Sequence, residues 1–131
     1  MHAPTQFRFE LDSWCYEYGA VRLRAGKLVC RLGGHDARFA EPFTVRPTPE
    51  QWQEFWRAVE RARVWEWLPE YCNEVLDGTC WSLELEWAGQ RVVSRGSNGF
   101  PPRNEVDYEP DSEFGVFAAA VRKLVGNRKR Q

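Results

Sequence analysis

Two short polar motifs in the second half of the chain hold the residues best suited to chemistry. The motif DGT covers Asp77–Thr79, and the motif GSNG covers Gly96–Gly99. Closely spaced glycines let several backbone N–H groups point at one phosphate, provided that a helix begins directly behind them. Here the next residues are Phe100–Pro102, which continue in an extended form. The spacing therefore does not predict a nucleotide site.

Other catalytic arrangements have equally little support. Ser97 as a nucleophile would need a base, and the only internal histidine, His35, has no acidic partner in a recognisable motif. Glu84 and Glu86 lie on one face of an expected strand, about 7 Å apart, but nothing near them in the sequence favours acid–base chemistry. In a simpler interpretation, Ser97 and Asn98 hydrogen-bond the local backbone and shape the end of a strand.

The four cysteines do not form a metal-binding pattern. Cys15, Cys30, Cys72 and Cys80 contain no C-x-x-C pair, and only two histidines accompany them, so a zinc site is not expected. No motif implies another cofactor. In a reducing compartment the thiols are expected to be small buried apolar residues, while a bridge between Cys72 and Cys80 stays open.

The charge balance and hydropathy of the chain narrow its partners and its compartment. With 18 basic and 19 acidic side chains, it lacks the positive field that non-specific binding to nucleic acid requires. It contains no apolar run of about 18 residues that could cross a bilayer, and its start lacks the order of a signal peptide. The sequence predicts a cytoplasmic protein without nucleic-acid or membrane partners, and its one basic run, Arg128–Arg130, is interpreted as a solvated tail.

Alternating apolar and polar residues predict the strands that would position the two motifs. The period of two is clear over 6–12 and again over 21–32, where an interruption at Gly26 predicts a hairpin. A less regular strand is expected over 37–46, with Pro42 indicating an edge or a bulge. Residues 81–87 and 90–96 should form an antiparallel hairpin about the Ala88–Gly89 turn.

Two helices complete the predicted elements. The first begins at Thr48, because Pro49 and Gln51 follow it at the spacing of a capping box, and its apolar positions recur to Ala62 at helical spacing. The second is capped by Asp111 or Ser112 and ends at Gly126. The segment 64–78, rich in aromatics and interrupted by a proline, is predicted to be a packed loop.

These elements follow one another in the order ββββαββα. Short connections favour an α+β fold with a mainly antiparallel sheet and both helices packed on one face. At 131 residues the chain fits a single domain spanning residues 1–131. The ordered core is expected over about 6–126, with the basic tail at 127–131.

An excess of aromatic residues suggests an interaction surface. Seven tryptophans are more than a small core normally needs, and exposed aromatics beside arginines are typical of interfaces. Arg95, Asn98, Phe100 and Arg103 are expected to sit together at one end of the last hairpin. This loop end is the preferred candidate site.

The predicted hairpin also brings the two motifs together. Residues 79–81 and 96–98 should be neighbours, so that Asp77 or Thr79 could hydrogen-bond Ser97 or Asn98. A network that stabilises the two turns is the favoured interpretation. The alternative is a small polar pocket with Trp81 as its wall.

The strings LDGTCWSLELEW and VVSRGSNGFP, followed by a Phe-rich helix, resemble a family of small bacterial proteins of unknown function. That family is similar in having LDGT-x-WSL, then S-x-GSN-x-x-P, then a helix entered through a phenylalanine. The resemblance covers Trp52–Val125 and implies the fold boundaries but no mechanism. The family pattern falls on Asp77, Gly78, Thr79, Trp81, Gly96, Ser97, Asn98 and Pro101.

We therefore expect a non-enzymatic interaction module, an accessory or immunity-type protein that binds another protein through its aromatic and arginine-bearing loops. The alternative is a small-ligand binder or hydrolase that uses the corner formed by the DGT and GSN motifs. Its polar groups would be Asp77, Arg95, Ser97 and Asn98. A homodimer formed through an open sheet edge is a third possibility.

Overall fold

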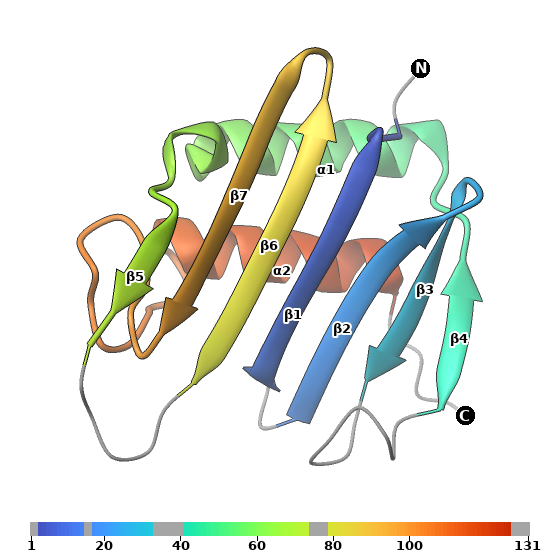
Figure 1. The fold of residues 1–131 in the computed structure, drawn as a ribbon. Helices are drawn as coiled ribbons and strands as arrows, with labels where there is room; N and C mark the ends of the chain where they lie inside the picture. Colours follow the sequence, from blue (N-terminus) through green and yellow to red (C-terminus); the bar gives the residue numbers. More distant parts are fainter. Residues whose placement is uncertain (1–2, 15–16, 33–40, 74–78, 127–131) are drawn as a thin grey trace.

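The computed structural model describes residues 3–14, 17–32, 41–73 and 79–126. Asp77, His35, Cys15, residues 37–40 of the expected fourth strand and the tail after Gly126 lie outside these ranges. The elements, shown in Figure 1, are β1 (Gln6–Trp14), β2 (Glu17–Arg24), β3 (Lys27–Leu32), β4 (Pro42–Val45), α1 (Pro49–Arg61), the 3-10 helix η2 (Val64–Glu66), β5 (Glu70–Cys72), β6 (Cys80–Trp87), β7 (Gln90–Ser97) and α2 (Glu113–Val125).

The strands form one sheet in the order β4-β3-β2-β1-β6-β7-β5, which makes seven strands over the described residues. Every neighbouring pair is antiparallel except β5 and β7, which are parallel. The predicted α+β class and mainly antiparallel sheet are confirmed. So are both hairpins, and β4 is an edge strand that begins at Pro42.

One predicted loop was wrong. The segment 64–78 contains η2 and then β5, whose Tyr71 lies opposite Gly96 of β7. The order is therefore ββββαβββα. In β5 only Tyr71 is buried, whereas Glu70 and Cys72 face outward. Three residues are too few to display a period of two, so the strand is specified by its pairing with β7.

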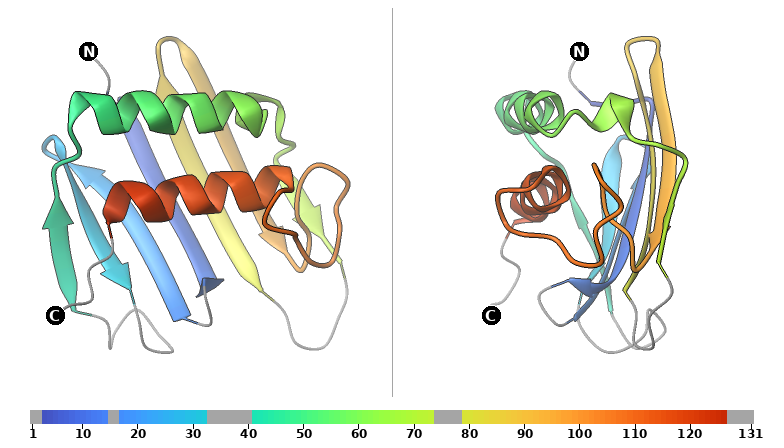
Figure 2. Two further views of the ribbon diagram at one scale, coloured as in Figure 1. Left: turned by 180° about the vertical axis from the view of Figure 1, so that it is seen from behind. Right: turned by 90° about the vertical axis from the view of Figure 1, so that its left-hand side faces the viewer.

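Both helices lie on the same face of the sheet, as Figure 2 shows. The predicted capping box of α1 is present, because Thr48 Oγ1 accepts from Gln51 N at 3.1 Å and Gln51 Oε1 accepts from Thr48 N at 2.8 Å. Ser112 caps α2 through Gly115 N at 3.2 Å. Among the described residues, no helix is long and apolar enough to cross a membrane.

The aromatic side chains fill the layer between the helices and the sheet. Trp56 of α1 stacks on Trp87 of β6 with ring centroids 4.1 Å apart, and Trp81 packs against Phe114 of α2 at 4.9 Å. The expected exposed aromatic surface was wrong. Buried residues include Trp67, Tyr71, Trp81 and Phe100, while Leu68, Val93 and Val106 are the large apolar side chains exposed among the residues whose burial is described.

The edges of the sheet, β4 and β5, are four and three residues long. Short edges offer few free backbone groups to a second strand. At β5 the side chain of Asn104 also donates to the carbonyl of Cys72 at 3.0 Å. Dimerisation through a sheet edge stays a prediction, and strands this short could form few hydrogen bonds with a second copy.

Candidate functional site

The predicted meeting of the two motifs is realised at one end of the β6–β7 hairpin. Trp81 pairs with Gly96 and Cys80 pairs with Ser97. Beyond the strands, Asn98 N donates to Thr79 O at 2.9 Å, and Thr79 N donates to the side-chain Oδ1 of Asn98 at 2.9 Å. The expected hydrogen bond between Thr79 and Asn98 is thus confirmed.

Asn98 belongs to a network of three asparagines that joins the end of the hairpin to β5. Its side-chain amide donates to Asn73 O at 3.3 Å. The side-chain amide of Asn73 donates in turn to two backbone carbonyls, Asn98 O at 2.9 Å and Asn104 O at 2.7 Å. Sequence reasoning missed Asn73 and Asn104, because their partners lie far away in the chain. The side chain of Asn98 is therefore occupied in holding loops together.

Trp81 and Phe100 lie in the core at this corner. Trp81 is 3% exposed, and its indole Nε1 donates to Gly99 O at 2.8 Å. Phe100 is 1% exposed and packs on Phe114 with ring centroids 4.8 Å apart. The Trp81 side chain is thus engaged in packing and in a backbone hydrogen bond.

The sheet divides the residues that were expected to sit together. Asn98 and Phe100 are buried at the end of the hairpin, whereas the side chain of Arg95 is exposed next to Glu70, with Nη2 to Oε2 at 3.7 Å. Arg103 is exposed in the turn between Phe100 and Glu105, which exchange two backbone hydrogen bonds. The expected joint surface of Arg95, Asn98, Phe100 and Arg103 was wrong, because Arg95 is exposed on β7 whereas Asn98 and Phe100 are buried beyond the end of that strand.

The face of the sheet opposite the helices carries a hollow of about 470 Å³ over β1, β6, β7 and β5. We call it the outer hollow. It includes Arg95, Ser97 and Trp81 from the predicted set, and its other lining residues are Glu10, Asp12, Glu70, Cys80, Ser82 and Gly96. Alternation along the sequence could place Glu10 and Asp12 on a polar face of β1. That this face adjoins Arg95 follows only from the strand order β1-β6-β7.

Negative charge dominates the outer hollow. Its lining includes three carboxylates, those of Glu10, Asp12 and Glu70, and one arginine, Arg95. Desolvation raises the pKa of Asp12, and the hydrogen bond from Cys80 N at 3.0 Å offsets only part of that rise. A cation placed in the hollow would favour the ionised form of Asp12, because an opposite charge lowers the pKa of a carboxyl group.

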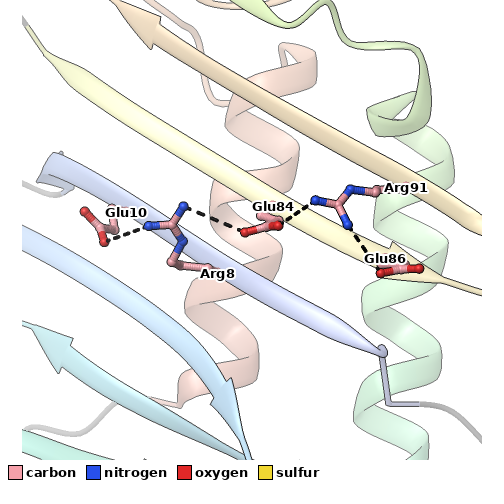
Figure 3. A network of polar contacts seen from close by, with 5 residues as sticks. All are labelled: Arg8, Glu10, Glu84, Glu86 and Arg91. Atoms are coloured by element: carbon pink, nitrogen blue, oxygen red, sulfur yellow. Dashed lines mark hydrogen bonds and ion pairs between the residues drawn. The ribbon is translucent and has the colours of Figure 1, made fainter.

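A chain of ion pairs continues from Glu10 across the same face (Figure 3). Arg8 lies 4.0 Å from Glu10 and 3.8 Å from Glu84, and Arg91 lies 2.8 Å from Glu84 and 3.6 Å from Glu86. Exposed pairs of this kind contribute less than about 1 kcal/mol each. Their effect is to orient the side chains, so that Glu84 and Glu86 are each paired with an arginine.

The described cysteines are free thiols, and the bridge left open between Cys72 and Cys80 is not formed. Both lie opposite Ser97 of β7, one on each side. Two strand spacings separate their backbones by about 10 Å, beyond the reach of a disulfide. Burial was predicted correctly for Cys30 and wrongly for Cys72 and Cys80. Across the described ranges, no three His, Cys, Asp or Glu side chains form a group that could hold a metal.

Thiol labelling should separate these cysteines. In a Cys15→Ser background, a water-soluble thiol reagent at pH 8 is expected to modify Cys72 and Cys80 quickly and Cys30 only after unfolding. Burial raises the pKa of Cys30 to about 12, so its reactive thiolate is scarce in the folded protein. Mass spectrometry of tryptic peptides identifies the labelled sites. Rapid labelling of Cys30 without denaturant would contradict its place in the core.

The sequence matches no protein-family model and no curated protein. The resemblance to small bacterial proteins therefore stays a prediction. Over the described residues of its pattern, the geometry assigns Thr79, Trp81, Gly96 and Asn98 to turn and core contacts. Among the described polar side chains of that pattern, Ser97 lines the outer hollow.

Proposed function

We propose that the protein is a non-enzymatic protein-interaction module whose binding surface is the uncovered face of the sheet. The observation that carries this proposal is the arrangement of the layers: both helices cover one face, and over the described residues β1, β6, β7 and β5 leave the other face open (Figure 2). The accessory or immunity-type role expected from the sequence belongs to the same proposal.

The open face has features that suit a folded partner. Ion pairs connect the charged side chains of Arg8, Glu10, Glu84, Glu86 and Arg91 across this face, and Val93 adds an exposed apolar side chain beside Glu84. Ordered charges at an interface give specificity and speed of association more than affinity. The outer hollow supplies a recess for a side chain of the partner.

Charge defines the side chain that the outer hollow would accept. Arg95 lies near Glu70 and Arg8 lies 4.0 Å from Glu10, so Asp12 supplies the excess negative charge of the hollow. A lysine or arginine of the partner would compensate it. We propose a folded protein partner that places a basic side chain in the outer hollow.

The small-ligand or hydrolase alternative retains one supporting observation, since Ser97 and Arg95 do line a hollow. Its other polar groups are engaged elsewhere. Asn98 accepts from Thr79 N and donates to Asn73 O, which leaves it little capacity for a substrate. The protein-binding proposal therefore has more of the geometry behind it.

Position-specific crosslinking tests the proposal. A photo-crosslinking amino acid at Val93, on the open face, should capture a defined protein from a lysate of the source organism. The same amino acid at Glu60, exposed on α1, is the matched control. Equal capture from both positions, or capture of nothing at Val93, would contradict the proposal. A small molecule retained in native mass spectrometry would favour the alternative.

Charge reversal then tests the chemistry of the captured partner. The double variant Glu10→Lys/Glu70→Lys is expected to weaken binding at least tenfold, because it turns two of the three carboxylates that line the hollow into cations that repel a basic side chain. Glu60→Lys makes the same kind of charge change on the helical side and should leave the affinity unchanged. Isothermal titration with the purified partner measures both. Unaltered affinity in the double variant would place the interface elsewhere.

A further inference from the structure

A second recess lies between the two helices, on the other side of the molecule from the outer hollow. It has a volume of about 540 Å³, and we call it the helical groove. Its floor includes Phe55 and Ala58 of α1 and Val116, Ala120 and Leu124 of α2. The helices run side by side over the sheet (Figure 2), so the groove follows their common direction.

The composition of α2 leaves an apolar stripe along this groove. Its charged residues are Glu113, Arg122 and Lys123, which lie at its two ends. Between them, Val116 and Ala120 are partly exposed and Ala119 is exposed. A helix that is apolar on most sides normally packs against neighbours on most sides. Here α2 packs on the sheet and on α1, and the stripe faces the groove.

The rim of the groove is positively charged. Lys123 Nζ lies 3.4 Å from Glu54 Oε1, so these two charges compensate each other across the groove. Arg57 and Arg61 follow on the next turns of α1, and no hydrogen bond or ion pair joins the side chain of either one to another described residue. Arg61 is in the last turn of α1, where the helix dipole stabilises its positive charge. Arg57 lies one turn earlier and lacks that stabilisation.

We infer that the helical groove binds an amphipathic helix of a partner protein, with apolar residues facing the stripe and acidic residues facing Arg57 and Arg61. Helix-in-groove recognition uses this combination of apolar floor and charged rim. From Gln51 to Arg61 the groove extends about 15 Å along α1 at the rise of a helix, which accommodates about three turns.

Charge argues against the nearest alternative occupant. The end of this chain contains Arg128, Lys129 and Arg130, which carry the same sign as Arg57 and Arg61. An acidic helix complements the rim, whereas the basic tail would be repelled by it. The inference concerns a different surface from the open face of the sheet, so either can fail without the other.

Two synthetic peptides test the inference. Both are capped helices of about 16 residues, long enough to form a helix in isolation, with leucine at i, i+3, i+4 and i+7. One carries glutamate at the flanking positions and the other lysine. In titrations of the full chain followed by amide NMR, the glutamate peptide should bind at least tenfold more tightly. The largest shifts are expected at Ala58, Ala119 and Ala120.

Charge variants complete the test. Arg57→Glu/Arg61→Glu should reverse the preference in favour of the lysine peptide, while Arg22→Glu/Arg24→Glu, on a strand far from the groove, should leave it unchanged. No binding of the glutamate peptide at millimolar concentration, equal binding of the two peptides, or shifts confined to the sheet would each overturn the inference. A second copy of this chain is the remaining alternative occupant, and light scattering of the free protein tests it. A dimer that dissociates in Arg57→Glu/Arg61→Glu would assign the groove to that second copy and overturn the inference.

Discussion

Gly96→Ala is expected to lower the free energy of unfolding by about 3 to 5 kcal/mol, because it overpacks a buried position of β7 and breaks a buried hydrogen bond. A Cβ on Gly96 would collide with the indole of Trp81 and with the carbonyl of Gly99. These are the two groups joined by the buried hydrogen bond from Trp81 Nε1. Relief of the collision moves the indole and leaves its N–H without an acceptor.

Urea unfolding followed by tryptophan fluorescence measures this change. Val93→Ala is the matched control, because Val93 is in the same strand and 54% exposed on its open face. The control should cost less than about 1 kcal/mol. If Gly96→Ala were as stable as Val93→Ala, the close packing of Trp81 over Gly96 would be refuted.

Asn98→Gly and Asn98→Ala are expected to destabilise the protein by different amounts. Both remove the side chain that accepts from Thr79 N and donates to Asn73 O, at a cost of about 2 kcal/mol. Asn98 also has a φ of +57°, in the left-handed region. Glycine adopts that conformation freely, whereas alanine adds about 1 kcal/mol of strain.

The order of stability should therefore be wild type, then Asn98→Gly, then Asn98→Ala. Thermal unfolding and urea titration give the differences. Ser97→Ala, one residue away on the open face, should stay within about 0.5 kcal/mol of wild type. Equal stability of the wild type and Asn98→Ala would mean that the side chain is not part of the structural network, and the ligand-binding alternative would then gain support.

The elements that could be predicted from the sequence are those whose signals are local. Thr48 and Gln51 form the cap that their spacing indicated, and Trp81, Leu83 and Leu85 of β6 alternate with less buried residues as the sequence pattern predicted. The strand β5 could not be predicted, because Tyr71 is specified by its position beside Gly96. That position is reached only when the distant β7 is in place.

The candidate site was predicted in part for the same reason. Hairpin register brought Thr79 to Asn98, but the choice of face was obscured in β7. Its inward residues Val92, Ser94 and Gly96 include only one that is clearly apolar, so alternation did not mark Arg95 and Ser97 as outward. The asparagine network was hidden further, since Asn73 and Asn104 meet only in the folded chain.

The number of tryptophans was a poor guide to exposed surface. Two helices over a broad sheet enclose a deep layer, and Trp56, Trp67 and Trp81 help to fill it. The contact between Trp81 of β6 and Phe114 of α2 becomes visible only when the two elements are packed together. Counting side chains cannot distinguish a large core from an aromatic surface.

The sheet order has a consequence for the timing of folding. β1 is the first strand of the chain and lies in the middle of the sheet, between β2 and β6. During synthesis β2 is available at once, but β6 begins only at Cys80. Until then the hydrogen-bonding groups of β1 that later meet β6 form a long open edge beside the apolar face of Phe7, Phe9 and Leu11. Such edges pair with other chains, so a nascent chain arrested before β6 should aggregate where the finished protein does not.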